Sequence, residues 1–201
     1  MVSQIFMEDK MQKVEEIFFK PEMLEAFLAR FRGEQILNIG NVVAVLENVK
    51  SGAKKIIHGV NIVTNDGDAY YAQMACGEAP DDDFDGASSG LRLGDTDTPA
   101  PGKTDTDVNN FLAGTAHALD ATYEQTDDPD TDNTGAGVDI VTWRFSYLTT
   151  EGNAVDIIEG AIVDDRTTPT AALTHFLFAA AFTKTSSDTL KVFVNHQFNG
   201  V

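Results

Sequence analysis

The sequence predicts a mainly β protein: an antiparallel β-sandwich of jelly-roll or Greek-key type, with a short helical arm at its N-terminus. The last third of the chain alternates apolar and polar residues, as half-buried strands do, whereas helical periodicity marks the start of the chain. Strands do not alternate with helices, so a parallel sheet of βαβ units is not expected. We therefore divide the chain into a helical arm over 1–40 and a sandwich domain over 41–201, with long acidic loops over 76–139.

The first 33 residues predict two short helices. Apolar residues recur at steps of three and four from Met7 to Phe18, and Pro21 and Gly33 mark the first turn and the end of a second helix. Such a stripe suits a protein core, or an arm that docks on a neighbouring subunit, because short isolated helices are marginal in water. For the arm, the predicted interface residues are Phe6, Ile17, Phe18, Phe27 and Phe31.

After Gly33 the pattern predicts strands. Two strands surround a turn at Ser51-Gly52, and a turn follows at 65–68. The run 69–76 fits a helix and a strand equally well, and we otherwise expect helix only in the first 33 residues. Three further strands follow near the C-terminus, the last two forming a hairpin, and Trp143 is the predicted centre of the core.

Composition excludes several classes of protein. The net charge is −18, and residues 76–139 hold 16 acidic residues against two basic ones, which argues against a nucleic-acid partner. No run approaches the about 20 apolar residues of a membrane span, and no signal peptide is recognised at the N-terminus, so we expect a protein made in the cytoplasm. The lone Cys76 forms no intramolecular disulfide and is expected to be a small buried hydrophobe. The long acidic loops are expected to be solvated and held by neighbouring subunits.

No catalytic constellation is recognisable. The four histidines have neither a metal-binding spacing nor a carboxylate at a fixed offset, and a GxSxG elbow is missing. The GKT at 102–104 lacks the upstream glycine of a phosphate-binding loop. We therefore expect no enzyme activity and no cofactor.

One group of carboxylates has a loose metal-binding spacing. Asp128, Asp130 and Asp132 alternate, and Asp139 is the twelfth residue counted from Asp128, as in a calcium-binding loop. However, Asn133 replaces the turn glycine, and Asp139 replaces the bidentate glutamate. A solvated acidic loop is the preferred interpretation, with a cation site as the alternative.

Recognisable motifs occur in four segments of the chain, 61–80, 91–108, 120–147 and 176–198. The motifs are a turn of the form N-[LI]-V-T-N-x-G, a glycine- and proline-containing segment ending in Asp-Thr, and a closing F-x-K-T-x-x-D-x-L-x-V hairpin. With these segments the chain resembles a group of virion structural proteins of tailed bacteriophages. The resemblance spans about residues 59–198, although Asp95 occupies a position that is often small.

This resemblance implies a non-enzymatic, repeated component of a virus particle, assembled in the host cytoplasm. The preferred placement is a capsid decoration or cement protein that contacts the major capsid protein and stabilises a phage head. The alternative is a tail or head-tail adaptor or fibre-base protein that contacts other virion subunits, and a calcium-dependent binding module is a weaker one. A homo-oligomer is expected, and the resemblance favours a trimer.

Overall fold

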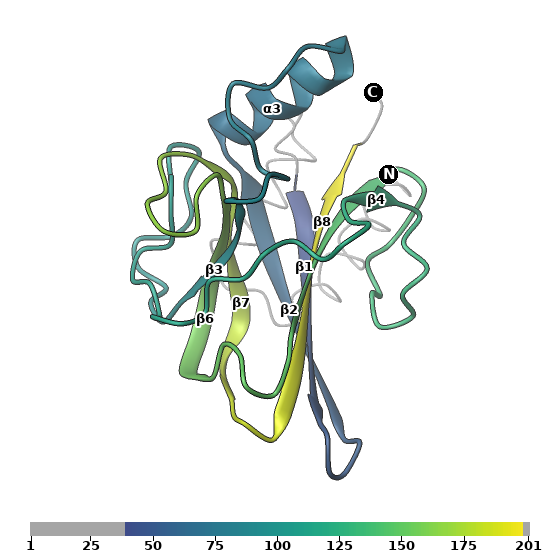
Figure 1. Cartoon of the computed structure of the whole chain (residues 1–201), viewed down its shortest axis with the longest axis vertical. Helices are drawn as coiled ribbons and strands as arrows, with labels where there is room; N and C mark the ends of the chain where they lie inside the picture. The colour runs from purple at the N-terminus through teal and green to yellow at the C-terminus, as the bar shows by residue number, and fades with distance from the viewer. Residues whose placement is uncertain (1–38, 199–201) are drawn as a thin grey trace, which may run out of the picture. The chain divides into compact units, whose positions relative to one another are not determined.

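The structure, a computed structural model, describes residues 39–198. Its strands form one antiparallel sheet in the order β3-β6-β7-β2-β1-β8-β5-β4, with a single helix (Figure 1). The expected mainly β, antiparallel class is therefore confirmed. The predicted interface residues Phe6, Ile17, Phe18, Phe27 and Phe31 lie outside the described residues. The elements are β1 (Ile39–Asn48), β2 (Lys54–Val63), α3 (Asn65–Cys76), β3 (Gly90–Gly94), β4 (Gln125–Thr126), β5 (Ile140–Tyr147), β6 (Ala154–Val163), β7 (Ala172–Lys184) and β8 (Asp188–Gln197).

The sheet curls around one main apolar core. Trp143 belongs to this core and is fully buried, as predicted, and the same cluster receives side chains from β3 at one end of the sheet and from β5 near the other. Strand alternation sends the next residues of the same strands to the opposite, outer face. The buried aromatic residues of this cluster are Tyr70, Phe84, Trp143, Phe145, Tyr147, Phe176, Phe178 and Phe182.

The helix α3 corrects two expectations: that helices stop at residue 33, and that 65–68 form a turn, because these four residues begin the helix. Thr64 caps its first turn by accepting a hydrogen bond from the Gly67 backbone N–H, and Gly77 ends it in the left-handed conformation. Tyr70 points into the core beside Trp143, with ring centroids 6.2 Å apart. The local capping signals thus resolve the ambiguous run 69–76 as helix.

The two predicted hairpins are present. Strands β1 and β2 pair from Ile39↔Ile62 to Glu47↔Lys54, around the predicted Ser51-Gly52 turn. Strands β7 and β8 are joined by a turn in which Asp188 accepts hydrogen bonds from the backbone and hydroxyl of Thr185. In β8 the alternation of buried and exposed residues does not continue to Phe198, whose side chain is 40% exposed.

Two further findings concern Cys76 and membrane spans. Cys76 is exposed in the last turn of α3, so the expectation that it is buried is wrong. The buried residues of α3 are Gly67 and Tyr70. On the described part of the chain, no helix has the length and apolar character that crossing a membrane requires.

Candidate functional site

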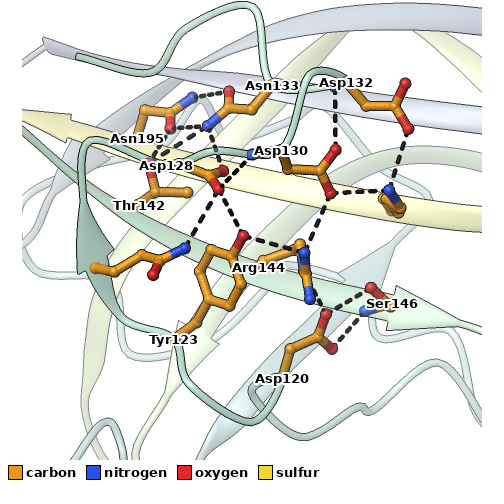
Figure 2. Close-up of polar contacts among 12 residues, drawn as sticks. Asp120, Tyr123, Asp128, Asp130, Asp132, Asn133, Thr142, Arg144, Ser146 and Asn195 are labelled. Carbon is orange, nitrogen blue, oxygen red and sulfur yellow. Dashed lines mark hydrogen bonds and ion pairs between the residues drawn. The ribbon is translucent and has the colours of Figure 1, made fainter.

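The acidic loop over 120–139 lies on the outer face of β5 and β8. It contacts Thr142, Arg144 and Ser146, which alternate with the core residues of β5, and it reaches Lys191 and Asn195 of β8 (Figure 2). The chain's own side chains therefore hold this loop.

Arg144 is the centre of the cluster. Its Nε donates to Asp120 at 2.7 Å, and its Nη1 donates to Asp130 at 3.1 Å and to the Tyr123 hydroxyl at 3.0 Å. The guanidinium carbon lies 4.2 Å from the centre of the Tyr123 ring. Asp120 also accepts from the backbone and hydroxyl of Ser146. A planar guanidinium suits this combination of a fork of donors and a stacked ring, which lysine does not provide.

Two lysines hold the tip of the same loop. Lys191 lies 2.8 Å from Asp130 and 3.1 Å from Asp132, and Lys54 of β2 lies 2.8 Å from Asp132. Hydrogen bonding by Lys54 is the largest influence on Asp132 and keeps the pKa of that carboxyl below its usual range. Burial raises the pKa of Asp130, but hydrogen bonds from Lys191 and the Asp132 backbone outweigh it and leave the pKa lowered. Both carboxylates are therefore more stable as anions in the folded protein.

Asp128 corrects the prediction of a solvated acidic loop. Its side chain is buried, and its two oxygens accept hydrogen bonds from the Tyr123 hydroxyl, the backbone and side-chain donors of the loop, and Asn133. The shortest of these, from Tyr123, is 2.6 Å long. Burial and the hydrogen bond to Asp128 raise the pKa of Tyr123 to about 12, so the phenol keeps its proton and acts as the donor.

Asn133 connects the loop to the sheet through amide groups. Its Nδ2 donates to Asn195 at 2.9 Å and to Thr142 at 3.3 Å, and its Oδ1 accepts from Asn195 at 3.0 Å. This reciprocal pair of amides is buried. Asn133 therefore has a specific role at the position where a calcium-binding loop has glycine.

The carboxylates that suggested a cation site have partners within the protein. Asp128, Asp130 and Asp132 lie together, but Asp139 is bonded instead to Gln197, at 3.1 Å. Among the described residues, no group of three His, Cys, Asp or Glu side chains is arranged to hold a metal ion. The alternating spacing is explained by the contacts to Arg144, Lys191 and Asn133, and does not require a cation.

A second acidic segment, 95–111, is anchored on β6 and β7. Glu159 is fully buried and accepts hydrogen bonds from the backbone N–H groups of Asn109 and Asn110, both at 3.0 Å. Arg92 of β3 pairs with Asp107 at 2.8 Å and lies over the ring of Phe111. An apolar cluster accompanies these polar contacts: Val108 and Phe111 of the segment pack against Ala161, Val163 and Ala172 of the sheet.

His175 completes this second anchor. Its Nε2 lies 3.0 Å from Glu159, its Nδ1 lies 2.7 Å from Asp105, and the side chain is fully buried. Burial lowers the pKa of His175, but hydrogen bonds to Glu159 and Asp105 outweigh it and raise the pKa above its ordinary value. Burial likewise raises the pKa of Glu159, and the hydrogen bonds from His175, Asn109 and Asn110 bring it below its ordinary value. The His175 ring therefore bridges a strand carboxylate and a loop carboxylate.

A third buried polar chain lies under α3. The Trp143 Nε1–H donates to the Tyr71 hydroxyl at 2.9 Å, which lies 2.6 Å from Nδ1 of His196. Burial lowers the pKa of His196 to about 3, so its ring is neutral at physiological pH and Nδ1 accepts from Tyr71. His175 and His196 are both buried and hydrogen-bonded within the fold.

The first two clusters attach the segments 120–139 and 95–111 to the sheet, and the third attaches α3 to β5 and β8. Each contains groups that are paired with one another, and none of the histidines described above contacts a serine or cysteine nucleophile. Arg144, Lys191, His175 and Glu159 were not predicted as site residues from the sequence. Arg144 had a signal, because alternation places it on the outer face between Trp143 and Phe145, but its partners are distant in sequence. His175 and Glu159 had no signal, because their shared partner segment lies about 50 to 70 residues away.

Comparisons with protein-family models, with curated proteins and with solved structures gave no match.

Proposed function

We propose that this protein is a non-enzymatic structural component of a tailed-bacteriophage virion, a decoration or cement protein that stabilises the head. The observation that carries the proposal is that both acidic segments, 95–111 and 120–139, are anchored to one antiparallel sheet by buried polar contacts. A component that contacts a repeating lattice needs surface loops of fixed shape, because ordering mobile loops on binding costs conformational entropy.

The contacts of the resembling segments support a structural role. Thr64 caps α3, Asp105 holds His175, and Asp188 closes the β7–β8 turn. Lys184 is buried at the end of β7. These positions act on folding and loop placement, which agrees with motifs that mark a fold and not a reaction.

We further propose the finer fold class and the assembly. The sheet is curled, and strands far apart in its order contribute side chains to the same core. This arrangement is compatible with a sandwich of jelly-roll or Greek-key type. The proposed homo-oligomer is a trimer, a choice that rests on the resemblance, and the proposed attaching arm is 1–40. Its partner is the major capsid protein, and the protein's location is the virion.

Two measurements on particles test this proposal. Quantitative mass spectrometry of particles purified from the cells that make the chain should give a copy number in proportion to the capsid subunits. Immunogold labelling should place the protein over the head. A copy number that fits a single ring, with label at the tail or the head-tail junction, would replace this proposal with the adaptor alternative. Absence of the protein from purified particles would reject both placements.

A further inference from the structure

Lys184 is a buried lysine with neutral partners. Its side chain is 1% exposed, and its ammonium nitrogen donates to the Leu148 carbonyl at 2.8 Å and to the Asn153 side-chain oxygen at 3.0 Å. Buried ammonium groups are ordinarily paired with a carboxylate, because burying an unpaired charge is costly. The environment of Lys184 therefore favours the uncharged amine.

The amine is chemically suited to attack a carbonyl. Burial lowers the pKa of Lys184, and the more distant Asp188 and Glu151 only partly oppose this. An uncharged lysine amine is a nucleophile, whereas the ammonium ion is not. The same burial restricts the side chain to the neighbourhood of the β5–β6 turn.

The amide of Asn153 is held in place on both sides. Its Nδ2 donates to the Thr149 carbonyl at 3.0 Å, while its Oδ1 accepts from Lys184. Pairing of Ala154 with Lys184 in the β6–β7 ladder fixes the two backbones next to each other. Gly152, at a φ of 57°, lets the turn pass directly over the Tyr147 ring, where a side chain would clash.

We propose that Lys184 and Asn153 join in an intramolecular isopeptide bond. The Lys184 Nζ attacks the side-chain carbonyl carbon of Asn153, the new N–C bond forms, and the bond from that carbon to Nδ2 breaks. A proton passes from Nζ to Nδ2, which leaves as ammonia, so the reaction needs no oxidant, reductant or cofactor. Holding two groups in contact can replace external activation in this way.

One feature of the turn assists the reaction. Asn153 is itself exposed, so ammonia can leave directly into solvent. The product would covalently tie the β5–β6 turn to the end of β7, and this inference does not rest on the proposed virion function.

Intact-mass spectrometry of the purified chain tests the bond. The expected mass is that of the sequence minus one ammonia. Succinimide formation at another asparagine gives the same loss, so a tryptic map must locate it. The expected product joins peptide 145–166 to peptide 167–191, with no cleavage after Lys184. An unchanged mass after incubation at mildly alkaline pH, together with a linear peptide ending at Lys184, would overturn the proposal.

Matched variants assign the bond to this pair. Lys184→Arg keeps a hydrogen-bond donor and should show the full mass of its sequence, as should Asn153→Ala, whereas Lys191→Arg should still lose ammonia. Ammonia loss from this same peptide pair in Asn153→Ala would contradict the assignment. If Lys184→Arg does not fold, the joined peptide in the unaltered chain decides alone.

Discussion

The His175 imidazole and the Glu159 carboxylate lie 3.0 Å apart, and neither side chain is exposed to solvent. Glu159 also binds two backbone N–H groups of the 95–111 segment, and His175 binds Asp105 of the same segment. This pair therefore joins two strands of the sheet to a loop that is distant in sequence. Charge on the pair should contribute directly to folding stability.

The first prediction concerns pH. The pKa of His175 is raised on folding, so its contribution is fully present below the unfolded pKa of about 6.5 and is lost as pH rises through the folded value. Urea unfolding should give a lower free energy at about pH 9 than at about pH 6. In His175→Gln this difference should shrink. The exposed His58→Gln is the control, and an equal pH difference in both variants would refute the role of His175.

The second prediction concerns Arg144. Arg144→Ala leaves Asp120 and Asp130 without their shared cation and should lower the free energy of unfolding by ~1–3 kcal/mol. Arg144→Lys should recover only part of this, because lysine lacks the fork of donors. Chemical denaturation provides the measurement. Lys55→Ala, at an exposed position of β2, should change stability little.

The third prediction separates two neighbouring acidic residues. Asp128→Asn places an NH₂ group among donors from Tyr123 and Asn133 and should destabilise the fold by ~1–3 kcal/mol. Asp127→Asn alters an exposed residue at a φ of 52°, which asparagine tolerates, and should be near neutral. Equal thermal unfolding of the two variants would show that the Asp128 contacts do not hold the loop.

The fourth prediction concerns the core. Trp143→Ala should cost ~3–5 kcal/mol, because it empties the centre of the core. Trp143→Phe should leave a smaller cavity than Trp143→Ala and so lower the free energy of unfolding less, although it also removes the hydrogen-bond donor to Tyr71. Thermal unfolding of both variants measures the difference. An unchanged midpoint for Trp143→Ala would contradict its central position.

Local patterns predicted β1, β2, β5, β7, β8 and the burial of Trp143, because alternation in a half-buried strand directly reports which face is buried. They missed β6, which is buried along its second half and does not alternate there. The helix α3 was left open, since Tyr70 and Met74 satisfy both periodicities, and the Thr64 and Gly77 caps decide the outcome. Cys76 was misjudged because one residue has no periodicity of its own.

The anchoring clusters were predictable only in part. The spacing of Asp128, Asp130 and Asp132 correctly marked them as a group, but not the cations that hold them. Those cations come from three strands, and their proximity is created by the sheet topology. A pattern within one segment contains no information about such distant partners.

Hydrogen exchange on the isolated chain tests most directly whether the acidic segments are integral to the fold. The amide hydrogens of Asn109, Asn110 and Asp130 are bonded to the carboxylates of Glu159 and Asp128. They should exchange far more slowly than in an unfolded chain, and Arg144→Ala should accelerate exchange at Asp130 but not at Asn109 or Asn110. Exchange of all three at the unfolded rate would contradict the account, because neighbouring subunits would then be needed to order these segments.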